Sequence, residues 1–254
     1  MYNPFDFTEK KILVTGASSG IGQTLSIALS KQGATVAMIA RNEDKINDTL
    51  SQMQGNNHIK ICVDLSQNKD LTEEFKTIVS DGKKLDGLVH CAGISSVESI
   101  QMLSSKRIDA QMHVNYYAFL ELVRLFSKKK YSNGGSIVGI SSIAAVSPGK
   151  CQTIYSATKA AMNASIESLA PELAPKNIRI NTIMPGFVKT PMFDSAFNID
   201  YTGSNDIVNE TLEHQLLGAS SPYEIANACM FLLSDASSCI TGRALHADGG
   251  SGLG

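Results

Sequence analysis

Short apolar runs rich in β-branched residues recur along this chain, and longer stretches suited to helices lie between them. Continuous apolar runs are typical of strands buried on both faces of a sheet, and strands that alternate with helices form parallel sheets. We expect strands at residues 11–15, 34–40, 59–63, 86–90, 135–141, 178–183 and 243–247, and helices at 20–31, 43–54, 67–80, 104–129, 154–173 and 221–234. Right-handed crossovers then predict an α/β fold, a doubly wound parallel sheet of about seven strands with helices on both faces.

The length of 254 residues suits one α/β domain or at most two small ones. The chain contains no internal repeat, low-complexity tract or linker that would divide it. We therefore expect residues 1–254 to form a single domain.

One segment, residues 190–218, breaks the alternation of strands and helices. A connection this long in a compact domain is usually functional or disordered. Its apolar residues could line a substrate site; they are Met192, Phe193, Phe197, Ile199 and Tyr201. We interpret the segment as a substrate lid, and the alternative is an inserted pair of helices with a small core of its own.

Charge and composition exclude several classes of partner. The net charge is −2 and there is no long basic run, so we expect no nucleic-acid surface. No apolar stretch approaches the ~20 residues that cross a bilayer. The five cysteines lack C-x-x-C spacing and the first residues lack the order of a signal peptide, which predicts reduced thiols and a cytoplasmic location. The histidines show no metal-ligand spacing, so no metal is assigned.

A glycine-rich loop, T-G-A-S-S-G-I-G at residues 15–22, joins the first expected strand to the first expected helix. Glycines in this place permit a tight turn and let backbone amides and the helix N-terminus approach a pyrophosphate. The spacing of Gly16, Gly20 and Gly22 differs from the familiar G-x-G-x-x-G fingerprint. With a strand before it and a helix after it, the loop predicts a nucleotide site and a Rossmann-type sheet.

The end of the second strand predicts which dinucleotide binds. An acid at this place would hold the ribose diol of NAD and repel a 2′-phosphate, but the chain reads Ala40-Arg41-Asn42. The guanidinium of Arg41 offers a planar donor fork suited to phosphate, so NADP(H) is favoured over NAD(H). The alternative for Arg41 is a surface pair with Glu43 or Asp44. Asp64, after the third strand, would contact the adenine amino group or cap the following turn.

Tyr155 and Lys159 are four residues apart in Y-S-A-T-K and so share one face of the expected helix. An ammonium beside a phenol favours the phenolate, and we expect it to lower the pKa of Tyr155 from its ordinary ~10 by ~1–3 units. Such a phenol would be a usable proton donor or acceptor near neutral pH. The pair is therefore a candidate catalytic centre.

Taken together, these motifs resemble the short-chain dehydrogenase/reductase family in its shorter form, from Lys11 to about Gly250. The resemblance adds Asn115 in H-V-N-Y-Y and Ser142 in I-S-S-I to the tyrosine and lysine. It also includes Pro185-Gly186 and the late D-G-G at residues 248–250. The resemblance implies an Asn-Ser-Tyr-Lys tetrad in a homo-oligomeric ketone reductase or alcohol dehydrogenase, similar to a 3-oxoacyl reductase.

By this resemblance Tyr155 would protonate the carbonyl oxygen and Lys159 would hold the ribose hydroxyls. Ser142, with Ser141 as its adjacent alternative, would stabilise the developing charge, and Asn115 would position a water. The expected cofactor-binding residues are Gly16, Ser18, Ser19, Gly20, Ile21, Gly22, Arg41, Asp64, Leu65, Cys91, Ala92, Gly93, Tyr155, Lys159, Pro185, Gly186, Val188 and Thr190. The expected substrate residues are Ser142, Cys151, Gln152, Phe187, Met192 and Phe193.

The chain departs from the family pattern at Cys91, where N-A-G is usual and this sequence reads His90-Cys91-Ala92-Gly93. A thiol is a poor donor and acceptor, which puts the rigidity of the adenosine side in doubt. We expect Cys91 to be a small buried filler, with a reactive thiol as the alternative. Pro171 predicts a bend or an early end of its helix between Glu167 and Pro171.

Two other functions compete with an NADP(H)-dependent enzyme. One is an NAD-dependent alcohol dehydrogenase of the same fold, and the other is a cofactor-sensing binding protein without catalysis. A sugar-nucleotide epimerase would favour G-x-x-G-x-x-G and a longer substrate domain, and both are missing. The small residues Ala157, Ala160, Ala161 and Ala164 would permit a helix-helix contact in a dimer or tetramer.

Overall fold

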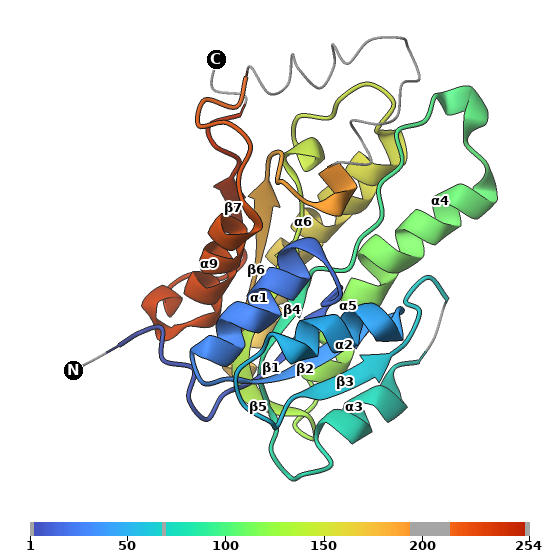
Figure 1. The fold of residues 1–254 in the computed structure, drawn as a ribbon. Coiled ribbons are helices and arrows are strands. Elements are labelled where there is room, and N and C mark those ends of the chain that lie inside the picture. The colour runs from blue at the N-terminus through green and yellow to red at the C-terminus, as the bar shows by residue number, and fades with distance from the viewer. Residues whose placement is uncertain (1–2, 68–69, 194–213, 252–254) are drawn as a thin grey trace.

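The computed structural model describes residues 3–67, 70–193 and 214–251. Its centre is a seven-stranded sheet in the order β3-β2-β1-β4-β5-β6-β7, in which every pair of neighbours is parallel (Figure 1). The strands are β1 (Lys11–Thr15), β2 (Thr35–Ala40), β3 (Ile59–Cys62), β4 (Leu85–His90), β5 (Ser132–Ile140), β6 (Ile178–Pro185) and β7 (Ala244–Ala247). The predicted α/β, doubly wound, Rossmann-type architecture is confirmed.

Helices cover both faces of this sheet (Figure 1). They are α1 (Gly20–Lys31), α2 (Glu43–Ser51), α3 (Thr72–Ile78), α4 (Ser105–Met112), α5 (Ala118–Phe126), α6 (Thr153–Leu173) and α9 (Pro222–Leu233). One apolar layer joins the sheet to α3, α5 and α6, and the other joins it to α1, α2 and α9. Leu13 belongs to the first layer and its neighbours Ile12 and Val14 to the second, because successive side chains of a strand point to opposite faces.

Several expected elements have different bounds. The helix expected at 43–54 ends at Ser51, and the one expected at 67–80 spans only Thr72–Ile78. Asp70 accepts hydrogen bonds from the backbone amide and hydroxyl of Thr72, so the local turn delays the start of α3. The strand expected at 135–141 begins earlier, at Ser132.

The helix expected at 104–129 is not uniform. It consists of α4, a π-helical turn at His113–Tyr117 and α5, which ends at Phe126. Insertions of this kind occur frequently at functional sites, and periodicity of apolar residues does not reveal them. This turn contains Asn115, the expected member of the tetrad.

The expected early end of the helix at Pro171 is wrong. Helix α6 continues to Leu173 before a 3-10 turn at Ala174–Lys176. A proline removes a single amide donor, and here the helix needs only two more residues before it ends. Asn177, with a φ of 56°, then turns the chain into β6 in the left-handed region.

The order of the strands reverses between β1 and β4, since β2 and β3 follow on one side and β5, β6 and β7 on the other. Ligands of open α/β sheets bind beyond the carboxyl ends of the strands at such a switch point. The loops that carry the expected site residues leave this edge. Among the residues that the structure describes, none of the helices has the length and apolar character required to cross a membrane.

Candidate active site

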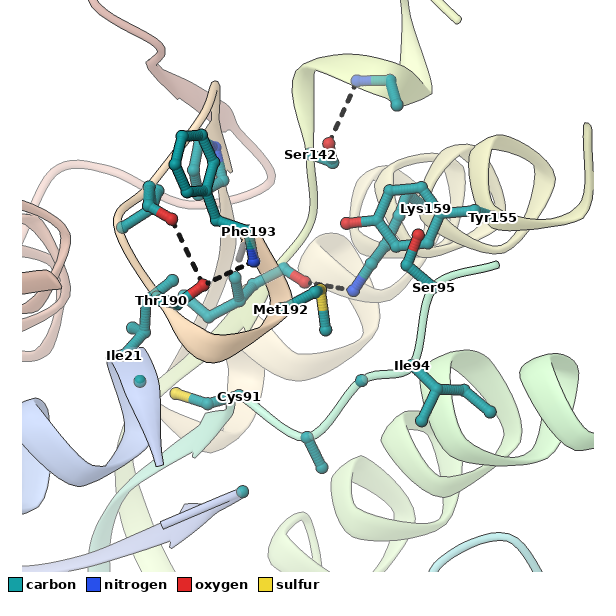
Figure 2. A pocket seen from close by; sticks show the side chains of 18 of the residues that line it. Ile21, Cys91, Ile94, Ser95, Ser142, Tyr155, Lys159, Thr190, Met192 and Phe193 are labelled. Carbon is teal, nitrogen blue, oxygen red and sulfur yellow. Dashed lines mark hydrogen bonds between the residues drawn. The ribbon is translucent and has the colours of Figure 1, made fainter. Parts of the chain in front are cut away.

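A cleft of about 1290 Å³ opens at the carboxyl edge of the sheet. Residues from the loops after β1, β2, β3, β4, β5 and β6 border it, together with the first part of α6. Every expected site residue lines this cleft except Asn115, which lies behind its wall and is fully buried. Figure 2 shows Ser142, Tyr155 and Lys159 on one side of the view and Ile21 and Cys91 on the other.

The glycine loop lies against the chain that follows β4. Gly16 has a φ of +66°, and a Cβ on it would stand 2.8 Å from the backbone nitrogen of Ala92. A Cβ on Gly22 would collide with the carbonyl oxygen of Gly16. Ser19, the N-cap of α1, makes no side-chain capping bond, so the first amides of this helix are available to an anion in the cleft.

Two cations lie beside the cleft: Arg41 follows the end of β2, and Lys45 is in the first turn of α2. Glu43 pairs instead with Lys60 at 3.1 Å, and no ion pair of Arg41 is found among the described residues. The surface pair proposed as the alternative for Arg41 is therefore not formed with Glu43. Sequence analysis missed Lys45; the available signal was its place four residues after Arg41, in the first turn of α2.

Asp64 also borders this part of the cleft. Its carboxylate accepts a hydrogen bond from the amide of Ser66 at 2.9 Å, so it caps the following turn. Turn capping was one of the two roles expected for Asp64. The hydrogen bonds of Ser66 lower the pKa of Asp64, and the charge of Arg41 adds a smaller effect in the same direction. Asp64 and Arg41 therefore lie near each other beside the cleft.

Thr15 and His90 join the ends of β1 and β4. The Nε2 atom of His90 lies 3.1 Å from the carbonyl of Val114, which can only accept, so Nε2 carries the proton. Its Nδ1 accepts from the Thr15 hydroxyl at 2.9 Å, and that oxygen accepts from the amide of Ala92 at 3.1 Å. Burial lowers the pKa of His90 to about 3, and the charge of Lys159 acts in the same direction, so the ring is neutral.

This network answers the doubt raised by Cys91, because the strand ends are joined without an asparagine at that position. Cys91 is partly buried and packs against the apolar layer of α1 and α9. Burial raises the pKa of its thiol to about 12, while the charge of Lys159 acts in the opposite direction. A thiol of this kind is unreactive at neutral pH, which agrees with the expected role as a filler.

Lys159 is 3% exposed and donates a hydrogen bond from Nζ to the carbonyl of Ile140 at 2.7 Å. The same nitrogen lies 5.6 Å from the centroid of the Tyr155 ring, one helical turn earlier in α6. Burial lowers the pKa of Lys159 to about 8. The expected juxtaposition of a phenol and an ammonium is present.

The expected direction of the Tyr155 pKa is wrong for this structure. Burial raises the pKa of the phenol, and the hydrogen bond of Ser142 lowers it by a smaller amount. Lys159 directs its ammonium to the carbonyl of Ile140, and desolvation of the phenolate is the larger effect. Tyr155 is therefore protonated at neutral pH.

The two adjacent serines have different surroundings. Ser142 borders the cleft, and its oxygen accepts from the amide of Ala144 at 3.1 Å, which leaves its own proton to donate. Ser141 donates its hydroxyl to the carbonyl of Lys159 at 3.2 Å and is 2% exposed. The geometry favours Ser142 over Ser141 as the group beside Tyr155.

Asn115 holds the loop that follows β4. Its Oδ1 accepts from the amide of Ile94 at 2.9 Å, and its Nδ2 donates to the carbonyl of Ile94 at 2.9 Å and to the Thr158 hydroxyl at 3.0 Å. Both amide protons are therefore used within the protein. Gly93 lies where a Cβ would stand 3.5 Å from both Asn115 Oδ1 and Lys159 Nζ.

Among the residues expected to bind substrate, the aromatic rings of Phe187 and Phe193 meet edge to face with centroids 5.6 Å apart. Cys151 has a φ of 64°, and Gln152 accepts from the amide of Gly149 at 3.1 Å, which closes the turn before α6. Sequence analysis missed the opposite wall, which consists of residues 94–99 after β4. Their extended backbone carried no periodic signal.

The long connection is described at its two ends only, residues 190–193 and 214–218, and Phe197, Ile199 and Tyr201 lie outside the described residues. Gln215 is 2% exposed, and its amide binds both backbone groups of Phe187, at 2.8 and 3.3 Å. The amide of Leu217 donates to Gly249 at 3.0 Å. Residues 214–218 are thus fastened to the body of the protein.

Comparisons with known proteins show which chains this protein is similar to. A family model described as enoyl-(acyl carrier protein) reductase matches residues 16–252. L-xylulose reductase of Caenorhabditis elegans is 36% identical over 251 residues, 97% of each chain. The 3-oxoacyl-(acyl-carrier-protein) reductase FabG of Rickettsia bellii is 35% identical over 248 residues, 96% of this chain and 98% of the relative.

Solved structures show the same similarity. L-sorbose reductase from Gluconobacter frateurii, complexed with NADPH and L-sorbose, superimposes with a TM-score of 0.86 at 26% identity, covering 99% of this chain and 100% of that one. The match to a curated relative above 30% identity and the family model both extend over nearly the whole chain. The protein therefore belongs to the short-chain dehydrogenase/reductase family, oxidoreductases of small carbonyl and alcohol substrates that use a nicotinamide cofactor.

Proposed function

We propose that the protein interconverts a ketone and a secondary alcohol with NADP(H), and that Tyr155 is its general acid and base. One observation carries the proposal: Tyr155, with Ser142 and Lys159 against it, borders the same cleft as the glycine loop and the open N-terminus of α1. A proton donor and a nucleotide cradle in one cleft are the parts that a carbonyl reductase needs.

The residues present fit a dinucleotide. A side chain has no room at Gly16 or Gly22, and the first amides of α1 are available to a pyrophosphate. NADP(H), when bound, supplies or accepts the hydride. We propose that it is held by Gly16, Ser18, Ser19, Gly20, Ile21, Gly22, Arg41, Asp64, Leu65, Cys91, Ala92, Gly93, Tyr155, Lys159, Pro185, Gly186, Val188 and Thr190.

In the direction of reduction, Tyr155 transfers its proton to the ketone oxygen while the Ser142 hydroxyl donates a hydrogen bond to that oxygen. The raised pKa of Tyr155 keeps the proton in place until the substrate oxygen becomes basic. Lys159 then stabilises the phenolate that remains. Asn115 holds Ile94 and Thr158, so in this proposal it acts by fixing the wall of the cleft.

Arg41 is proposed to select NADP(H) by binding the 2′-phosphate, with Lys45 as a second cation. Arg41→Ala should weaken NADPH binding ten- to a hundredfold, because a charge-assisted hydrogen bond contributes ~1.5–3 kcal/mol. NADH binding should change little. Titration of both cofactors by fluorescence measures this, with the exposed Arg243→Ala variant as a control outside the cleft. Equal affinities of the unmutated protein for NADPH and NADH would contradict the assignment.

A panel of ketones assayed by NADPH oxidation tests the proposed activity. Turnover of any ketone separates an enzyme from a cofactor-sensing protein. Turnover with NADH alone would instead support the NAD-dependent alternative. The named relatives act on sugars and acyl thioesters, so the panel should contain both classes beside simple ketones.

We propose that residues 190–218 act as a lid on a single-domain enzyme. Because residues 214–218 are fastened to the body of the protein, we expect the response to ligands at residues 190–193. Amide exchange at residues 190–193 should slow when NADP and a substrate analogue are bound, because closure excludes water. The amides of Leu217 and Gly218, which are already bonded, should be protected in both states. Hydrogen exchange followed by mass spectrometry measures both regions. Identical exchange at 190–193 with and without ligands would show a fixed wall.

We also propose a cytoplasmic homo-oligomer, a dimer or tetramer. Ala157 and Ala164 are exposed on α6, and such small side chains allow a second helix to approach closely. Sedimentation of the purified protein tests this proposal.

A further inference from the structure

Residues 94–99 run as an extended segment along the cleft, and one face of the neighbouring helix fastens them. Three helix side chains, each four residues from the next, contact three alternate residues of the segment: Arg107 bonds Glu98 at 2.8 Å, Gln111 bonds Ser96 at 2.7 Å, and Asn115 bonds Ile94 at 2.9 Å. We call this set of contacts the ladder. Its polar side chains come from α4 and the π-helical turn.

The ladder has a simple geometric basis. Four residues of a helix rise about 6 Å, and two residues of an extended chain advance about 6.6 Å. The two spacings are nearly equal, so one helix face keeps in step with every second residue of an extended segment. Gln111 is 3% exposed and Asn115 is fully buried, so water competes little for these bonds. The amide of Glu98 adds a bond to the carbonyl of Cys151 at 2.9 Å, and both residues border the cleft.

Ser95, Val97 and Ser99 lie between and after the residues that make the ladder contacts. All three border the cleft, as Ile94 and Glu98 also do, and the two serines are exposed. No hydrogen bond of the Ser95 hydroxyl is present among the described residues. Figure 2 shows this hydroxyl directed to the side of the cleft that holds Tyr155 and Lys159.

Ser95 is also near the reacting centre. Gly93 lies so close to Lys159 that a Cβ on it would stand 3.5 Å from Nζ, and Ser95 follows two residues later, about 6.6 Å further along the extended chain. Ser95 and Tyr155 border the same cleft, so a ketone whose oxygen meets Tyr155 lies in the space that Ser95 borders. A free hydroxyl at this place can donate to and accept from a hydroxyl group.

We propose that Ser95 selects substrates that carry a hydroxyl group on the carbon next to the reacting carbonyl, and that Gln111 is a positioning residue that keeps Ser95 in place through Ser96. The Ser95 part rests on the proposed ketone reduction. The Gln111 part depends only on the fold. A buried helix side chain thus influences which ketone is accepted without touching it.

The first experiment compares hydroxyacetone with butanone, in which a methyl group replaces the hydroxyl. Ser95→Ala should lower kcat/KM for hydroxyacetone about tenfold, as expected for one lost hydrogen bond, and for butanone by less than about twofold. Ser127→Ala is the matched control, because its hydroxyl bonds the carbonyl of Arg124 outside the cleft. Equal losses for the two ketones in Ser95→Ala would overturn the assignment of Ser95.

The second experiment needs no turnover. Gln111→Met keeps the length of the side chain but removes its amide, so the amides of residues 95–99 should exchange at least about tenfold faster while those of β5 stay unchanged. KM for hydroxyacetone should rise, with kcat and the Kd of NADPH nearly constant. Gln52→Met is the control, since that amide bonds the carbonyl of Asp48 on the surface.

The two experiments separate the possible failures. If the unmutated protein reduces no ketone, the proposed function fails and the Ser95 assignment fails with it, while hydrogen exchange still decides the role of Gln111. If ketones are reduced but exchange in Gln111→Met equals that of the unmutated protein, the positioning role is overturned.

Discussion

Tyr155→Phe should reduce turnover by ~10²–10⁴-fold, the usual contribution of a positioned acid and base. Phenylalanine keeps the ring and its packing and removes only the transferable proton, so the Kd of NADPH should stay nearly constant. Steady-state kinetics with any ketone that the unmutated protein reduces measures the loss. Tyr116→Phe is a suitable control, because that phenol bonds Ser165 at 2.8 Å and does not border the cleft. A Tyr155→Phe protein with full activity would exclude Tyr155 as the acid.

The protonation of Tyr155 should not limit the rate of ketone reduction until the pH is well into the alkaline range, because burial raises the pKa of its phenol. A general acid must be protonated when the substrate binds, and a raised pKa preserves this form over a wider range. The opposite reaction, oxidation of the alcohol, needs the phenolate and should therefore gain from higher pH. The direction of the pKa shift favours reduction at neutral pH.

Lys159→Met should have two opposite effects, a loss of turnover of at least about 10²-fold and a gain in stability at pH 7. Turnover falls because the charged donor near the phenolate is removed. Stability rises because the pKa of Lys159 is lowered from 10.5 to about 8 by burial, and this shift costs about 3 kcal/mol at ~1.4 kcal/mol per unit. The lost charge-assisted bond to the carbonyl of Ile140, ~1.5–3 kcal/mol, offsets much of that and leaves a gain of up to about 1.5 kcal/mol in the free energy of unfolding.

The pH dependence identifies the cause of that gain. Between pH 8 and 10.5 the unfolded chain holds a proton on Lys159 that the folded protein has released, so the stability of the unmutated protein rises with pH in this window. The advantage of Lys159→Met should therefore shrink above pH 8 in urea titrations without cofactor. Lys11 is the matched control: it is equally buried but pairs with Asp81 at 2.6 Å, so Lys11→Met should destabilise the protein. If Lys159→Met were less stable than the unmutated protein at pH 7, burial of its charge would not be the controlling effect.

The sequence predicted the parts of the molecule whose physical cause is local. Strands appeared where apolar residues are continuous, and the glycine loop, Tyr155 and Lys159 line the cleft because a turn and a helical spacing are short-range properties. The direction of the Tyr155 pKa was wrong because it depends on desolvation by distant segments, and on the carbonyl of Ile140, which receives the ammonium. The wall at 94–99 was missed because its position follows from how separate loops meet.

The bond from Thr15 to His90 was likewise hidden in the sequence. These two residues are paired across β1 and β4, and only the register of the strands brings a hydroxyl to an imidazole. Because the family usually has an asparagine at position 91, the sequence put the rigidity of the chain near Cys91 in doubt. In the structure the residue before it, His90, joins the ends of the two strands through the Thr15 hydroxyl.

The π-helical turn at His113–Tyr117 should make this part of the chain sensitive to insertions and deletions. A turn of this type contains one more residue than an α-helical turn, and that residue rotates everything that follows it about the helix axis. Before the turn, Arg107 and Gln111 face the wall of the cleft; after it, Phe119 and Leu122 face the sheet. Deletion of a single residue here would leave a regular helix but turn one of these two faces away from its partner. Natural variants of this protein should therefore tolerate substitutions between Arg107 and Leu122 far better than insertions or deletions.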